Sequence, residues 1–233
     1  IKDRHNKIIA FAGRTFEGDD PAKYINSSET PIYNKSAVLY GLSDSKKYLT
    51  KQNVAIIVEG YLDYLQLYQA GIKNVAAVSG TAFTDSHAIE LKKYVQTVKI
   101  AYDGDKAGKS AAIRAGYVLL KNGFSPEIIS LPDGMDPDDW IQKSGPDPFL
   151  DAVDNSLNLF QFQFDNILKN KQSPNTISTL VNEILFELSL ITDPIHRELN
   201  LKELAKVSKL NEHSLYESLT KLLNKKYTRG KIL

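Results

Sequence analysis

A continuous apolar run, Val54-Ala55-Ile56-Ile57-Val58, constrains the fold of this chain more than any other feature. A strand without polar alternation is typical of a parallel sheet that is covered on both faces. Three further short apolar runs follow, at residues 75–78, 98–102 and 127–131. Stretches with helical spacing separate them, including Ala107 to Lys121, which ends at Asn122-Gly123. This alternation predicts an α/β fold built on a parallel sheet.

The segments on either side of the sheet region differ from it. Residues 1–53 are expected to form short strands and turns, because a Gly18-Asp19-Asp20-Pro21 turn cluster is present and no helical period persists. Beyond about Phe149 the strand signal ends. Helical spacing then appears at Ile177, Leu180, Val181, Ile184, Leu185 and Leu188. We therefore expect three parts, at residues 1–53, 54–150 and 151–233, the last a small helical bundle.

The composition excludes several classes of protein. There is no cysteine, and the four histidines are scattered without metal-ligand spacing, so neither disulfides nor a thiolate zinc site is expected. No apolar run is long enough to span a membrane, and the amino terminus is polar, so we expect a cytoplasmic protein. The net charge of +1 combines +3 in residues 1–53, −3 in residues 54–150 and +1 in residues 151–233. Differences in net charge this small are typical of ordinary solvated surfaces, so the charge distribution alone does not indicate a function.

Carboxylates follow three of the four predicted strands, at the point where each strand ends. They are Glu59 and Asp63 after the first run, Asp103 and Asp105 after the third, and Asp133, Asp136 and Asp138 after the fourth. The carboxyl ends of parallel strands meet at one edge of a sheet, so these side chains are expected to gather there. Like charges repel unless cations neutralise them, and ligands that are all oxygen favour Mg²⁺ or Mn²⁺.

Each of these carboxylates also has an ordinary structural interpretation. Asp103-Gly104-Asp105 is often only a turn followed by a helix cap, and Asp136-Pro137 is a good helix start. Glu59 is harder to dismiss, because a carboxylate directly after a buried strand has no packing purpose. The segment from Gly104 to Ser110 is not a phosphate-binding P-loop, since three residues separate its glycines where the motif needs four. Taken together, the strand ends indicate a metal site.

Glu59-Gly60-Tyr61 followed by Asp103-Gly104-Asp105 resembles the Toprim signature, and the resemblance covers about residues 54–140. This signature is shared by DnaG-type primases, type IA and type II topoisomerases, OLD-type nucleases and RecR-like proteins. The flanking segments are similar to DnaG-type primases in particular. The matching residues are Gly13-Arg14, Lys23 to Ser27, Lys35, Leu39 to Leu42 and Leu131 to Asp138. Two departures are Ala12, where many relatives have glycine, and Met135, where an acid is common.

The resemblance implies a fold and an activity. The fold is a Toprim parallel sheet with flanking helices, preceded by the C-terminal part of a mixed α+β basic subdomain and followed by a helical subdomain. The activity is synthesis of RNA primers on single-stranded DNA from NTPs. The implied metal ligands are Glu59, Asp103 and Asp105 for one ion, Asp136 and Asp138 for a second ion or for shared contacts, with Asp63 behind them. The implied nucleotide- or DNA-phosphate contacts are Arg14, Lys23, Tyr24, Asn26 and Lys35.

The resemblance also implies partners. They are a single-stranded DNA template, NTPs, the RNA–DNA hybrid product, and a replicative helicase through a domain outside this chain. Guanosine tetra- or pentaphosphate is a candidate inhibitor of the same site. The location would be the cytoplasm, at the nucleoid and the replication fork. Two alternatives stay open: a topoisomerase or nuclease fragment that uses the same acids to cleave DNA, and a non-catalytic Toprim scaffold in DNA repair.

Overall fold

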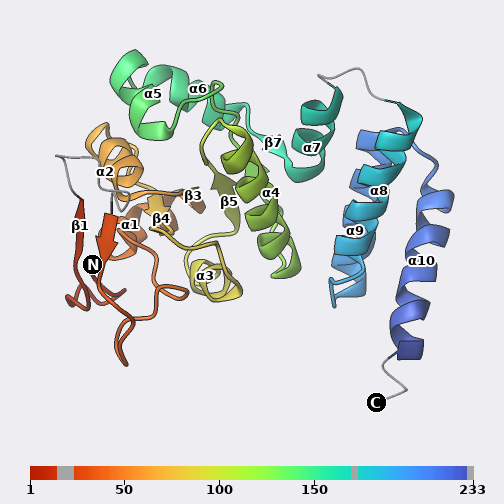
Figure 1. Cartoon of the computed structure of the whole chain (residues 1–233), viewed down its shortest axis with the longest axis horizontal. Coiled ribbons are helices and arrows are strands. Elements are labelled where there is room, and N and C mark those ends of the chain that lie inside the picture. The colour runs from red at the N-terminus through yellow and green to blue at the C-terminus, as the bar shows by residue number, and fades with distance from the viewer. Residues whose placement is uncertain (15–23, 169–172, 230–233) are drawn as a thin grey trace.

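The computed structural model describes residues 1–14, 24–168 and 173–229. Three parts lie side by side along the long axis (Figure 1). A short amino-terminal part precedes a central α/β domain, and a group of long helices lies at the opposite end. No helix in the described ranges is both long enough and apolar enough to cross a membrane. The domain boundaries predicted at residues 53 and 150 stay predictions.

The central domain is built on a five-stranded sheet in the order β4-β3-β5-β6-β7. Four strands are parallel, namely β3 (Val54–Val58), β4 (Val75–Ala77), β5 (Thr97–Ile100) and β6 (Glu127–Ile128). The predicted parallel sheet is confirmed. The prediction that no strand follows Phe149 is wrong, because β7 (Leu157–Asn158) pairs antiparallel with β6. A strand of two residues is too short to show any periodicity.

Helices cover both faces of the sheet, as the unbroken apolar run in β3 predicts. Ala55 and Ile57 point into one buried cluster, while Ile56 and Val58 point into another. The helices of the first cluster are α1 (Leu42–Gln52), α3 (Asp85–Leu91) and α4 (Lys106–Lys121). Those of the second are α2 (Tyr61–Gln69), α5 (Pro137–Ser144) and α6 (Asp147–Asp154). The sheet is thus the middle of three layers.

Helix α1 corrects the expectation that residues 1–53 hold only strands and turns. It begins after Gly41, which has a φ of 78° and offers no side-chain cap. Its buried residues, Leu42, Ser45 and Leu49, include a serine, so the apolar stripe is too weak to recognise in the sequence. A β-carbon at position 41 would lie 2.1 Å from the Tyr64 ring, so both the positive φ and the close approach require glycine.

The carboxyl-terminal helices form the expected bundle. They are α7 (Leu159–Leu168), α8 (Pro174–Leu188), α9 (Pro194–Ser208) and α10 (Glu212–Arg229). The predicted stripe of α8 is confirmed, because Leu180, Ile184 and Leu188 are all buried. Helix α7 contacts both α4 and α9, and its Phe160 and Phe164 belong to the same buried cluster as the sheet. The bundle and the central domain therefore share one core.

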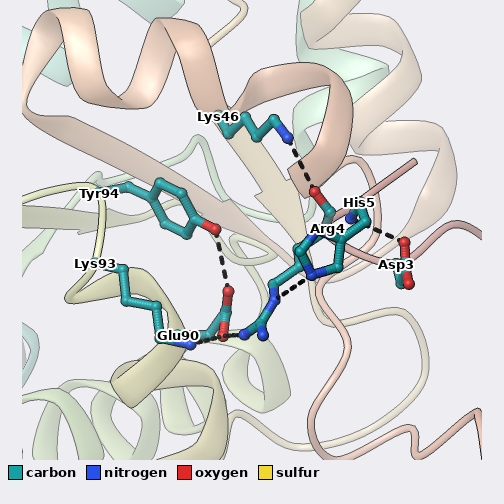
Figure 2. A network of polar contacts seen from close by, with 7 residues as sticks. All are labelled: Asp3, Arg4, His5, Lys46, Glu90, Lys93 and Tyr94. Carbon is teal, nitrogen blue, oxygen red and sulfur yellow. Dashed lines mark hydrogen bonds and ion pairs between the residues drawn. The ribbon is translucent and has the colours of Figure 1, made fainter. Parts of the chain in front are cut away.

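The amino-terminal part is attached to the central domain at the β4 edge. Strands β1 (Ala12–Arg14) and β2 (Tyr24–Asn26) form an antiparallel pair, and Tyr40 exchanges two backbone hydrogen bonds with Ala77. A polar network supports this attachment (Figure 2). In it the Arg4 guanidinium contacts Glu90 of α3 at 3.3 Å, and Lys46 of α1 donates to the Arg4 carbonyl at 3.0 Å. These contacts join the amino-terminal part to β4, α3 and α1.

His87 joins α3 to the amino-terminal part from inside the core. Its side chain is fully buried, Nδ1 accepts from the Thr84 backbone N–H at 3.2 Å, and Nε2 lies 3.3 Å from the Lys35 carbonyl. Thr84, the predicted helix cap, also donates its hydroxyl to the Ser36 carbonyl at 2.6 Å. Burial lowers the pKa of His87 to about 4, so the ring is neutral at physiological pH.

We expect His87 to make the fold sensitive to mild acid. Unfolded His87 takes up a proton below about pH 6.5, whereas folded His87 does so only near pH 4, so stability falls as the pH drops between those values. The loss in the free energy of unfolding approaches about 3 kcal/mol near pH 4. Urea unfolding from pH 4 to 7.5 should show this component in the wild type and in His213→Gln, whose histidine is exposed, but not in His87→Gln. An identical pH dependence in all three proteins would contradict the assignment.

Candidate active site

Four carboxylates line one cavity at the carboxyl ends of the parallel strands. Glu59 follows β3, Asp103 follows β5, and Asp136 precedes α5, while Asp63 lies on the first turn of α2. The cavity has a volume of about 480 Å³. Its remaining lining comes from Asn26, Gly60, Tyr61 and residues 78–82. The expected gathering of acids from three strand ends is therefore present.

The charges of these carboxylates are poorly compensated by protein groups. Burial raises the pKa of Glu59 to about 7, and repulsion from Asp103 adds to it, while the Arg114 guanidinium opposes the shift. Burial also raises the pKa of Asp103, and repulsion from Asp136 and Asp105 raises it further. One oxygen of Glu59, Oε1, is buried and has no hydrogen-bond partner. Such an atom costs free energy unless a cation or a donor reaches it.

Asp63 has a different position from the other three. It is 6% exposed, and its two oxygens accept from the backbone N–H groups of Gly60 at 2.9 Å and Asp138 at 3.2 Å. Burial raises the pKa of Asp63 to about 7, against the effect of the Gly60 hydrogen bond. The side chain thus joins the segment after Glu59 to the start of α5. The metal-supporting role expected of Asp63 stays a prediction.

Asp105 and Asp138 do not line the cavity. The Asp105 side chain caps α4 and accepts from the Gly108 N–H at 2.7 Å, while Asp138 accepts from Gln142 at 2.6 Å. Asp133 is exposed and pairs with Lys109. Across residues 1–14, 24–168 and 173–229, no three His, Cys, Asp or Glu side chains surround one point closely enough to hold a metal ion. The acids share a cavity without converging on a single centre.

Two glycines allow the loop that carries Asp103 to pack tightly. A β-carbon at Gly108 would lie 2.3 Å from the Asp103 carbonyl oxygen, and one at Gly104 would lie 2.1 Å from the Pro132 carbonyl oxygen. The start of α4 and the turn after β6 therefore touch the Asp103 loop directly. Backbone contacts of this kind leave Asp103 little freedom to move away from the cavity.

The predicted phosphate contacts are only partly placed at the cavity. Asn26 lines it, whereas Arg14 lies exposed on β1 and the Lys35 side chain is outside the lining. Lys23 and the Tyr24 side chain fall outside the described part of the chain. Of these residues, the cavity lining includes Asn26 and does not include Arg14 or Lys35.

Two features of the cavity were missed in the sequence. The loop after β4, residues 78–82, forms one wall, and the Tyr61 hydroxyl donates to Asn26 Oδ1 at 2.8 Å across another. Ser79-Gly80 was a recognisable turn signal, and it follows a strand that ends at the same sheet edge. The Tyr61 contact joins residues 35 positions apart and had no signal in the sequence.

Comparison with known proteins identifies two parts of the chain. Residues 56–141 match the Toprim-like family, and residues 1–46 match the family described as DNA primase catalytic core, N-terminal domain. The DNA primase of Clostridium acetobutylicum is 36% identical over 228 residues, which cover 94% of this chain and 37% of that protein. The DNA primase of Listeria monocytogenes is 34% identical and is covered to 36%. The chain thus spans little more than a third of these curated relatives.

Solved structures agree with the sequence comparison. A DNA primase domain from Pseudomonas aeruginosa matches with a TM-score of 0.82 and 31% identity, covering 96% of this chain and 70% of that one. A structure described as the DnaG catalytic core matches with a TM-score of 0.75 and 32% identity, covering 92% and 71%. Fold, acidic cavity and sequence therefore agree, and the chain belongs to the DnaG-type DNA primase family, within its catalytic core.

Proposed function

We propose that this chain is the catalytic part of a primase that makes RNA primers on single-stranded DNA. The observation that carries the proposal is the cavity in which Glu59, Asp103 and Asp136 meet Asn26 of the amino-terminal part. Acids suited to divalent ions and an amide suited to a nucleotide thus line one space. The family supports the same activity, since the matching relatives are DNA primases.

The residues at the cavity fit divalent metal ions. All the donors are carboxylate oxygens, which suit Mg²⁺ and Mn²⁺ rather than zinc. Glu59 Oε1 has no hydrogen-bond partner, and the pKa values of Glu59 and Asp103 are raised. A bound cation would contact such an oxygen and would lower both pKa values. In this proposal Glu59 and Asp103 hold one ion with Asp105, and Asp136 holds a second with Asp138. Asp105 and Asp138 would have to leave their present hydrogen bonds to take part.

The reaction joins the 3′-oxygen of the growing primer to the α-phosphorus of an NTP. The bond between that phosphorus and the bridging oxygen breaks, pyrophosphate leaves, and the hydroxyl proton passes to solvent. Bound divalent ions supply the Lewis acid that activates the hydroxyl and balances the charge on the leaving group. Asp63 keeps the Glu59 segment and the start of α5 together, and the Asp103 loop is held by its glycine contacts. The chain's own contribution is thus a fixed arrangement of charge.

The proposed contacts to nucleotide and DNA phosphates come from the amino-terminal part. Asn26 offers a hydrogen-bond donor at the cavity itself, and Lys23, Tyr24, Lys35 and Arg14 belong to the same basic segment. Contacts of this kind hold a template without reading its sequence. Template DNA, NTPs and the hybrid product are the proposed ligands, and a guanosine tetra- or pentaphosphate would compete with GTP for the cavity. A replicative helicase is a proposed partner of the whole primase.

We expect Glu59→Gln to raise stability without metal and to remove stabilisation by metal. The substitution deletes a half-buried carboxylate that repels Asp103, and after screening by solvent this repulsion is worth about 1 kcal/mol. An ion that binds only the folded state stabilises it, so millimolar Mn²⁺ should raise the melting temperature of the wild type far more than that of the variant. Glu198→Gln, at an exposed site on α9, is the control. The metal site would be contradicted if Glu59→Gln is less stable than the wild type without metal and Mn²⁺ raises the melting temperatures of both proteins equally.

We expect Asp103→Asn to lower primer synthesis by more than about 100-fold while leaving single-stranded DNA binding intact, since it removes charge stabilisation and no template contact. Synthesis would be measured as labelled NTP incorporated on single-stranded DNA. The assay would use this chain and a chimera in which it replaces the matching part of the Clostridium acetobutylicum primase. Asp133→Asn, in the exposed turn nearby, should retain activity. Shortened DNA instead of incorporated NTP would favour the nuclease alternative. If the chain neither incorporates NTP nor shortens DNA, and Mn²⁺ does not change its melting temperature, the non-catalytic scaffold would be favoured.

A further inference from the structure

Tyr61 connects two walls of the cavity that come from distant parts of the sequence. It is the first residue of α2, two positions after Glu59, and its ring packs edge-on against Tyr40 with centroids 4.7 Å apart. This packing fixes the ring, and the residue is only 8% exposed. Its hydroxyl then donates to Asn26 Oδ1 at 2.8 Å. The position of the Asn26 amide therefore depends on a Toprim-domain side chain.

The amide of Asn26 is oriented as well as positioned. Its nitrogen Nδ2 donates to the Ser79 carbonyl at 3.5 Å, while its oxygen accepts from Tyr61. A carbonyl oxygen only accepts hydrogen bonds, so the nitrogen end must face Ser79. The Ser79 contact is long and weak, which leaves the Tyr61 bond as the stronger restraint. The second N–H of Nδ2 remains available to an acceptor in the cavity.

The loop that faces this amide is shaped to stay close to it. Ser79 and Gly80 both have positive φ, 56° and 83°, which turns the chain sharply after β4. A β-carbon at Gly80 would lie 3.4 Å from Asn26 Nδ2, so the loop and the amide are in contact. The Ser79 hydroxyl is buried beside the Tyr61 side chain, and Ser79 lines the cavity. Asn26, Tyr61 and Ser79 thus form one polar part of the cavity lining.

We infer that Tyr61 is a positioning residue for nucleotide binding, holding the Asn26 amide so that Nδ2 donates to an acceptor oxygen of the bound NTP. The inference rests on the proposed function, because it assigns a second wall of the same cavity. The acceptor is a phosphate or a ribose oxygen. The Tyr61 hydroxyl bonds to Asn26, so in this inference its effect on nucleotide binding passes through the Asn26 amide.

The test is Tyr61→Phe, which removes the hydroxyl and keeps the ring against Tyr40. Tyr64→Phe is a closely matched control, because Tyr64 is buried on the same helix, also packs edge-on against Tyr40 at 5.1 Å, and bonds away from the cavity. Losing one neutral hydrogen bond corresponds to a change of about three- to ten-fold. We expect the Kd for GTP in the presence of Mn²⁺ to rise by that factor in Tyr61→Phe and to stay unchanged in Tyr64→Phe. Mn²⁺ binding should be equal in both variants.

A double-mutant cycle separates positioning from a general loss of structure. In an Asn26→Ala background, Tyr61→Phe should have no further effect on the Kd for GTP, because the group it positions is gone. Comparing GTP with dGTP narrows the acceptor: a loss confined to GTP indicates the 2′-hydroxyl, and an equal loss indicates a phosphate or another ribose oxygen. Additive losses in the cycle, or equal Kd values for Tyr61→Phe and Tyr64→Phe, would overturn the inference. A wild-type chain that binds no NTP with Mn²⁺ would instead overturn the proposed function.

Discussion

The repulsion among half-buried carboxylates at one sheet edge is the constraint around which the rest of this structure is organised. Glu59 and Asp103 follow neighbouring parallel strands, so the backbone itself brings their charges together. Neither can move far, because β3 is buried on both faces and the Asp103 loop is locked by close glycine contacts. The core therefore supplies the rigidity that keeps like charges in one cavity, at a cost in stability that a bound cation would remove.

The surrounding elements hold this arrangement together from three sides. Asp63 joins α2 to the start of α5 through two backbone hydrogen bonds. Helix α7 extends the same core into the carboxyl-terminal bundle. On the third side, His87 and the Arg4–Glu90 network hold the amino-terminal part against α3, while Tyr61 and the Ser79 carbonyl bond directly to Asn26. Loss of any of these contacts would loosen a wall without removing a carboxylate.

Sequence reasoning found the sheet and the acidic cavity because both depend on local patterns. An unbroken apolar run predicts a strand covered on both faces, and a carboxylate at its end predicts where the charge will lie. It missed α1, whose stripe contains a serine, and β7, which is only two residues long. It also missed the contact between Tyr61 and Asn26, because pairing across 35 residues depends on how β2 docks onto the domain. The places of Asp105 and Asp138 are decided by helix capping and a local hydrogen bond rather than by their proximity to strand ends.

The central claim is that this cavity holds divalent ions and a nucleotide together. A crystal structure of the chain soaked with GTP and Mn²⁺, with data collected at the manganese absorption edge, tests it most directly. We expect anomalous peaks in contact with the carboxylates of Glu59, Asp103 or Asp136, and the triphosphate of GTP bound between them and Asn26. Manganese and nucleotide bound only elsewhere on the molecule, with these carboxylates untouched, would contradict the claim.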